Sequence, residues 1–151
     1  MAKLGNHPSL NALTTIDPLF LLGVRWRNMD ANNATAALPL SGKRVMVLED
    51  DVFVKMGLES TLLEAGAQIG TLAHLRTVDA AILDVRLGDA FNSFNIACEL
   101  DRRSVPFLFY TGQSAQNLRA LRSEWPRCKI IAKPAEPTAI VEAVVDLLHG
   151  K

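Results

Sequence analysis

Short apolar runs and longer stretches with helical spacing alternate along most of this chain. Runs dominated by apolar residues predict strands at 45–48, 67–71, 80–83, 106–110 and 129–132. Between and after them, apolar residues recur at helical spacing, which predicts helices over 54–65, 94–103, 118–125 and from Pro137 onward. Gly66 is placed to end the first helix, and Pro137 suits the first position of the last one. Because strands alternate with helices, the pattern predicts a parallel sheet covered on both faces.

The beginning of the chain lacks this regularity. The segment 1–41 is rich in Asn, Ala, Thr and Pro and holds no lasting period. We therefore expect an irregular, flexible extension there, followed by one domain spanning 42–151. The apolar run Pro18–Val24 is much shorter than the ~20 residues of a membrane helix. No signal-peptide pattern is present either, so we expect a cytoplasmic protein with no membrane contact.

Composition and charge argue against several classes of function. Sixteen basic and sixteen acidic residues give a formal net charge of zero, so we expect no nucleic-acid partner, which would call for a basic surface. The cysteines, Cys98 and Cys128, lack metal-ligand spacing. They lie in apolar stretches, and we expect them to act as small buried hydrophobic residues. Nucleotide binding is disfavoured because the chain has neither a GxxxxGK loop nor a GxGxxG turn.

Polar residues of distinct kinds follow four of the predicted strands. Glu49 and Asp50 follow the first strand and Asp84 follows the third. Thr111 follows the fourth strand and Lys133 follows the fifth. In parallel sheets covered by helices, ligands bind at the carboxyl ends of the strands. We therefore expect these side chains to share one rim of the sheet.

The residue types on this rim suit the chemistry of a phosphoryl group. Carboxylates that share a rim repel one another unless a cation lies among them, and Mg²⁺ suits oxygen ligands. A lysine and a hydroxyl can stabilise a phosphoryl group during transfer, and a carboxylate can attack it to form an acyl phosphate. Each residue alone has an ordinary explanation, as a helix N-terminal charge or a turn residue. The ordered set is more specific than its members.

Four motifs, VMVLEDD, AAILDVRL, FLFYTG and IIAKP, resemble those of the receiver domain of two-component response regulators, over about Lys43–Leu148. The resemblance implies a flavodoxin-like, doubly wound sheet of five parallel strands in the order 2-1-3-4-5. It also implies that Asp84 is the phosphorylated residue, that the Thr111 hydroxyl rearranges towards the phosphoryl group, and that Lys133 pairs with it.

The same resemblance implies a cofactor and a partner. Glu49, Asp50, Asp84 and the backbone carbonyl of Arg86 would hold Mg²⁺. The peptide before Pro134 would be cis. The phosphoryl group would come from a sensor histidine kinase or a histidine phosphotransfer protein.

The chain departs from the family pattern at three places. Arg86 puts a long cation at the entrance of the expected site, and Ile130 stands where the family usually has a switch aromatic residue. Only residues 72–79 separate the second and third predicted strands, whereas a helical crossover takes about a dozen residues or more. We therefore expect the second helix of the family fold, which would connect these two strands, to be shortened or missing. We also expect the edge strand beside it to be frayed.

Three functions compete. The leading interpretation is a stand-alone, single-domain response regulator, because no effector domain follows before Lys151. It would be no enzyme beyond catalysing its own phosphorylation and dephosphorylation, and it would act by protein contact through the 113–148 face; a weak homodimer is compatible with this. The alternative is a degenerate receiver that serves as a phosphorylation-independent interaction module. A phosphatase of the haloacid-dehalogenase type is disfavoured, because that family has a D-x-D pair on its first strand, whereas Asp84 follows the third.

Overall fold

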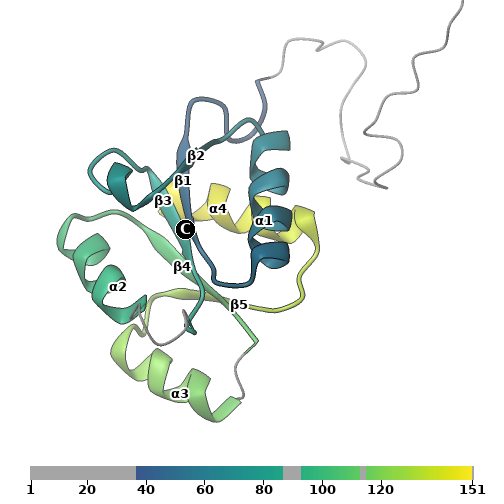
Figure 1. The fold of residues 1–151 in the computed structure, drawn as a ribbon. Coiled ribbons are helices and arrows are strands. Elements are labelled where there is room, and N and C mark those ends of the chain that lie inside the picture. Colours follow the sequence, from purple (N-terminus) through teal and green to yellow (C-terminus); the bar gives the residue numbers. More distant parts are fainter. Residues whose placement is uncertain (1–36, 87–92, 113–114, 151) are drawn as a thin grey trace, which may run out of the picture. The chain divides into compact units, whose positions relative to one another are not determined.

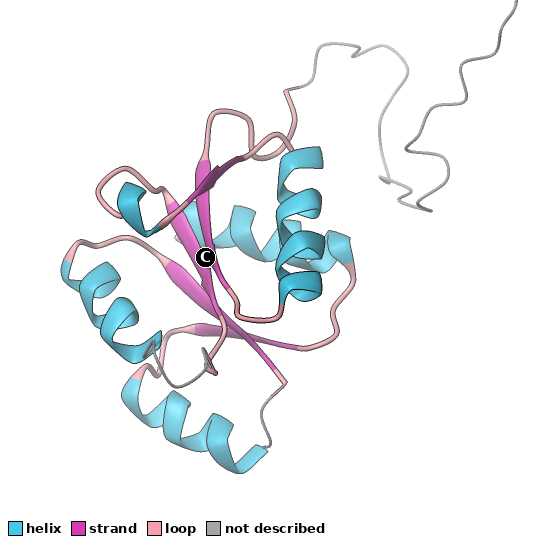
Figure 2. Cartoon of the chain, in the orientation of Figure 1, coloured by secondary structure: helices cyan, strands magenta, loops and turns pink. Residues whose placement is uncertain are grey.

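The chain forms a parallel sheet with helices on both faces (Figure 1, Figure 2). The structure, a computed structural model, describes residues 37–86, 93–112 and 115–150. Its strands are β1 (Arg44–Leu48), β2 (Gln68–Gly70), β3 (Ala80–Leu83), β4 (Phe107–Thr111) and β5 (Lys129–Ala132). Its α-helices are α1 (Val52–Glu64), α2 (Ser93–Arg102), α3 (Ala115–Glu124) and α4 (Pro137–Leu148). The five described strands lie in the order β2-β1-β3-β4-β5 and pair in parallel, which confirms the predicted fold.

Two apolar layers cover the sheet. Helices α1 and α4 pack on one face, and α2 and α3 pack on the other (Figure 1). Strand β3 shows why both faces need a cover, because all four of its side chains are buried. Ala80 and Ile82 join the layer of α1 and α4, while Ala81 and Leu83 join the layer of α2 and α3. A strand that is apolar on both faces is typical of a central position in a parallel sheet.

The crossover between β2 and β3 is short, as predicted. Residues 71–79 contain a 3-10 helix, Leu72–His74, instead of the α-helix that normally connects two such strands, and β2 is only three residues long. The Arg44 backbone N–H donates to Asp79 Oδ2 at 2.7 Å, which ties the return of the crossover to β1. A Cβ on Gly70 would lie 2.6 Å from Val78, so the glycine allows the crossover to pack closely.

Local sequence signals fix both ends of α1. The Asp51 carboxylate accepts hydrogen bonds from the backbone N–H groups of Phe53 and Val54, as a helix N-cap does. Gly66 adopts a positive φ of 91° just after the helix, which confirms its predicted role as the stop. Leu40 is fully buried against this layer, and its N–H donates to the Ala65 carbonyl at 2.9 Å. The packed core therefore includes Leu40, which lies before β1.

Part of the predicted organisation lies outside the described residues. The expected N-terminal extension, 1–41, falls almost entirely there, so its boundary with the 42–151 domain stays a prediction. Within the described ranges, none of the helices has the length and apolar character needed to cross a membrane.

The two cysteines differ in exposure. Cys128 is half-buried before β5, and burial raises the pKa of its thiol to about 12. Cys98 on α2 is exposed, so the expectation that both are buried is wrong for this residue. The physical reason is its helical phase, since the neighbouring Ala97 takes the position that faces the sheet.

This difference predicts selective alkylation. Because a thiol with a pKa of about 12 holds almost no thiolate at pH 8, iodoacetamide should modify Cys98 at least about a hundredfold faster than Cys128. Intact-mass kinetics on the native protein check this, and Cys98→Ala should abolish the fast phase. Equal rates for the two thiols would contradict the structure.

Candidate functional site

The parallel sheet brings the predicted site residues to one rim. Asp84 directly follows β3, and its backbone N–H donates to the Leu48 carbonyl at 2.8 Å, which continues the pairing with β1. The Lys133 backbone N–H donates to the Thr111 carbonyl at 3.0 Å, which does the same between β5 and β4. Backbone hydrogen bonds therefore fix both residues at the carboxyl ends of their strands.

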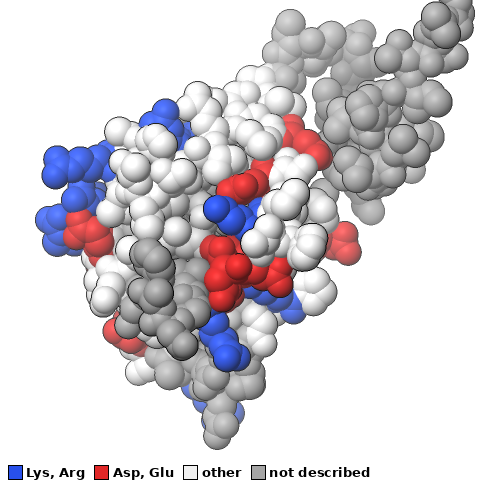
Figure 3. All heavy atoms as spheres, viewed as in Figure 1, with Lys and Arg blue, Asp and Glu red and all other residues white. Residues whose placement is uncertain are grey.

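Three carboxylates converge on this rim. One carboxylate oxygen each from Glu49, Asp50 and Asp84 lies within 4.8 Å of the others. Asp84 is buried and Asp50 is exposed, so the cluster runs from the interior to the surface. Acidic side chains gather beside the N-terminal end of α1 on the surface drawn in Figure 3. These groups lie close enough to repel one another strongly unless a cation is present.

Lys133 supplies a cation to this cluster. Its Nζ donates to Asp84 Oδ2 at 2.9 Å and also to Glu49 Oε2. The Glu49 and Asp84 side chains are only 1% and 9% exposed and the Lys133 side chain 18%, so these ion pairs are largely shielded from water. A shielded ion pair is stable only when both partners stay in place.

Burial and pairing shift two pKa values at the site. Burial raises the pKa of the Glu49 carboxyl, and its hydrogen bonds with Lys133 and the Asp51 N–H oppose the rise only in part. Burial lowers the pKa of Lys133, but the hydrogen bonds to Glu49 and Asp84 outweigh it and raise the pKa above its ordinary value. Lys133 therefore stays protonated at neutral pH and can act as a fixed positive charge.

The donor set fits a small, hard cation. Glu49, Asp50 and Asp84 offer only oxygen atoms, which Mg²⁺ prefers, and the exposed Asp50 leaves one side of the cluster open to solvent. The Arg86 backbone N–H donates to Asp84 Oδ1 at 3.2 Å, and the Arg86 side chain is exposed. The Arg86 carbonyl as a ligand stays a prediction.

The remaining predicted features lie at or near the site. Thr111 is the last residue of β4 and is buried, so its hydroxyl lies in the interior beside the rim. The peptide between Lys133 and Pro134 is cis, as the resemblance implied. Ile130 is half-buried and packs in the layer of α2 and α3.

Two residues at the site were missed by sequence reasoning. The buried Ser93, at the start of α2, donates its hydroxyl to the Asp84 and Val85 carbonyls and so holds the backbone that carries Asp84. The buried Tyr110 lies with its ring 5.3 Å from Lys133 Nζ. Neither has a motif signal, because a serine at the start of a helix and a tyrosine in a strand are common.

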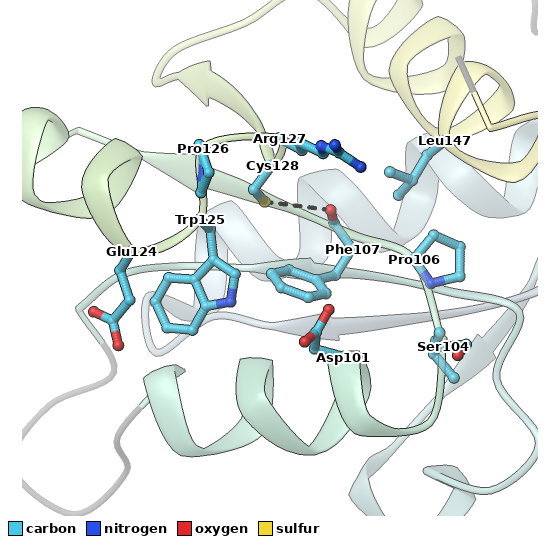
Figure 4. Close-up of a pocket in the computed structure, with 11 residues that line it drawn as sticks. Asp101, Ser104, Pro106, Phe107, Glu124, Trp125, Pro126, Arg127, Cys128 and Leu147 are labelled. Carbon is cyan, nitrogen blue, oxygen red and sulfur yellow. Dashed lines mark hydrogen bonds between the residues drawn. The ribbon is translucent and has the colours of Figure 1, made fainter.

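A pocket among the described residues lies away from this site. It has a volume of about 580 Å³ and is open to solvent. Phe107, Trp125 and Cys128 line it with Asp101 and Arg127 (Figure 4). Phe107 begins β4 and Cys128 precedes β5, so this pocket lies at the amino ends of the strands, whereas the acidic rim lies at their carboxyl ends. It includes none of the predicted site residues.

Comparisons with known proteins identify the fold. No model of a known protein family matches the sequence, and no curated protein matches it. Solved structures do match. A CheY-like response regulator receiver domain protein from Methanospirillum hungatei has a TM-score of 0.62 and 18% identity, covering 72% of this chain and 94% of that one.

Two further receiver structures give the same picture. The non-phosphorylated receiver domain of HemR from Leptospira biflexa has a TM-score of 0.56 and 24% identity, with 70% of this chain and 95% of that one covered. Chemotaxis protein CheY4 from Vibrio cholerae has a TM-score of 0.58 and 18% identity, with 70% and 98% covered. The chain therefore has the fold of CheY-like receiver domains.

The acidic cluster predicts metal binding that depends on its carboxylates. Isothermal titration calorimetry should detect Mg²⁺ binding by the wild-type protein, and Asp50→Asn should weaken the affinity at least about tenfold, because one charged ligand is lost. The matched control is Asp101→Asn, an exposed carboxylate on α2. An equal loss in both variants, or none in either, would contradict a site at the rim.

Proposed function

We propose that this chain is a response regulator receiver that accepts a phosphoryl group on Asp84 in a Mg²⁺-dependent phosphorelay. The observation that carries the proposal is the shielded contact of Lys133 with Asp84, in a cluster with Glu49 and Asp50. The CheY-like fold supports it, since the solved neighbours are receiver domains.

The proposed chemistry is a single transfer to a carboxylate. An Asp84 oxygen attacks the phosphorus of a phosphohistidine, a P–O bond forms, the P–N bond breaks, and the proton needed by the leaving imidazole comes from solvent. Lys133 is already fixed beside Asp84 and neutralises charge on the arriving phosphoryl oxygens. The Thr111 hydroxyl would donate to another phosphoryl oxygen. Bound Mg²⁺, held by Glu49, Asp50 and Asp84, would supply further positive charge.

Phosphorylation by a small donor tests this proposal. Incubation with acetyl phosphate and Mg²⁺ should add the mass of one phosphoryl group, and Asp84→Asn should abolish the addition, because no acceptor oxygen is left at that position. Intact-mass spectrometry is the measurement, and Asp101→Asn is the matched control.

The alternative function gives a different result in the same experiment. A receiver that serves only as an interaction module would gain no mass, and the wild-type and Asp84→Asn proteins would behave alike. The short β2–β3 crossover, Arg86 and Ile130 favour that function. The Lys133 contacts with Glu49 and Asp84 favour phosphorylation.

Helix α1 offers a docking surface for the phosphodonor. Besides its buried face, it carries large apolar side chains that are unusually exposed: Val52 at 64%, Phe53 at 86%, Met56 at 62% and Leu63 at 54%. Phe53, Met56 and Leu63 fall at the spacing that forms one stripe along a helix. The stripe begins next to the acidic rim, because α1 starts just after Glu49 and Asp50.

The charges beside this stripe indicate what kind of partner it fits. If Phe53 and Met56 occupy the core positions of a helix pair, Glu59 and Glu64 occupy the flanking positions of the seam. Two copies of α1 would therefore bring acidic flanks together, which disfavours self-pairing. A helix with an apolar stripe and basic flanks fits better. We propose that the histidine-bearing helix of a sensor kinase or phosphotransfer protein, in the cytoplasm, is this partner.

Output would use another surface. The face expected to contact a downstream protein, 113–148, includes α3, β5 and α4. Residues 113 and 114 lie outside the described residues, as do several α3 side chains. The downstream contact stays a prediction.

A charge placed in the α1 stripe should separate the two routes to phosphorylation. Met56→Glu should leave labelling by acetyl phosphate within about twofold of wild type. Transfer from a histidine-phosphorylated donor should fall more than about tenfold, because a charge is buried in the interface. Leu72→Glu, at an exposed leucine in the 3-10 helix Leu72–His74, is the control. Equal loss from both donors would place Met56 in the fold or the site instead.

A further inference from the structure

Tyr110 lies at a junction between the acidic rim and the start of α4. It directly precedes Thr111 in β4 and pairs with Ile131 of β5. It is 7% exposed and belongs to the apolar layer of α1 and α4. It therefore faces away from Ile130, which packs in the layer on the other side of the sheet.

The ring of Tyr110 contacts the lysine that approaches Asp84. Lys133 Nζ lies 5.3 Å from the ring centroid, within the range of a cation–π interaction. The same ammonium donates to Asp84 and Glu49. The ring and the two carboxylates together restrict the lysine, whose long side chain would otherwise sample several rotamers.

The hydroxyl of Tyr110 contacts the turn that follows this lysine. It accepts a hydrogen bond at 3.3 Å from the backbone N–H of Ala135, two residues after Lys133. Helix α4 begins two residues further on, at Pro137. One side chain thus contacts both the ammonium at the site and the backbone that leads into α4.

We propose that Tyr110 is a positioning residue: its ring directs the Lys133 ammonium towards Asp84, and its hydroxyl couples that position to the start of α4. A change in the lysine contact would then reach α4 through the Tyr110 side chain of β4. It would not depend on residue 130 of β5, which is an isoleucine here. The phosphorylation arm of the test rests on the proposed function; the spectroscopic arm does not.

The spectroscopic arm uses the fact that Tyr110 is the sole tyrosine of the chain. Incorporation of 3-fluorotyrosine therefore gives one ¹⁹F resonance. Lys133→Met should shift this resonance in the metal-free, unphosphorylated protein, because the cation above the ring is lost. Lys129→Met, at the start of β5, is the matched control and should leave it in place. An unchanged resonance in Lys133→Met would overturn the proposal, whether or not Asp84 can be phosphorylated.

The kinetic arm separates positioning from general destabilisation. Tyr110→Leu should slow labelling by acetyl phosphate about five- to thirtyfold, as expected for loss of one partly shielded cation–π contact. Its Mg²⁺ affinity should stay within about twofold of wild type. In a Lys133→Met background the same substitution should cost no further rate. An equal slowing in both backgrounds would overturn the positioning role, whereas an unlabelled wild-type protein would overturn the proposed function instead.

A last variant tests the hydroxyl. Tyr110→Phe keeps the ring under the lysine but removes the acceptor for Ala135. The Ala135 amide should then exchange with solvent at least about tenfold faster, because it loses its hydrogen bond. Amide exchange measured by NMR reports this on the folded protein. An unchanged exchange rate at Ala135 would overturn the coupling to α4.

Discussion

Repulsion among carboxylates is the constraint on which this site depends. Glu49 and Asp50 follow β1 and Asp84 follows β3, and one carboxylate oxygen from each lies within 4.8 Å of the others, in a setting partly removed from water. Such a cluster is stable only with a compensating cation. Lys133 supplies part of this charge through its ion pairs with Glu49 and Asp84, and these contacts join the ends of β1, β3 and β5. In the proposed function, Asp84 would accept the phosphoryl group and Lys133, which pairs with it, would stabilise the charge on that group.

The shortened crossover leaves the acidic rim intact, because Asp84 follows a central strand of the sheet. Asp84 follows β3, which has paired strands on both sides and a buried side chain at every position. The shortened crossover affects β2, which pairs only at the edge. Loss of a full second helix therefore leaves the backbone of the acidic site in place. Arg44 and Asp79 stabilise the shortened return by a hydrogen bond near the opposite end of β1.

Two surfaces near the site have different physical character. The rim itself is charged, and its geometry is set by hydrogen bonds and ion pairs. The adjoining stripe on α1 is apolar and exposed, with acidic residues beside it. The rim carries the groups for the proposed phosphoryl transfer but offers little surface for a partner. Helix α1 offers an apolar contact surface but no reactive group. A helical partner that contacts α1 would bring its reactive group to the rim next to it.

The sequence by itself determined the elements, their parallel arrangement and the residues at the strand ends. It could do so because apolar spacing, helix-stop glycines and strand-end polar residues are local signals. Only the tertiary structure decided that Cys98 is exposed, that Leu40 is buried, that the Ser93 hydroxyl donates to the Asp84 carbonyl, and that the Tyr110 ring lies near Lys133. These features depend on helical phase or on contacts between segments far apart in the chain. No local pattern encodes which side chain will lie beneath an ammonium group that folding brings from another strand.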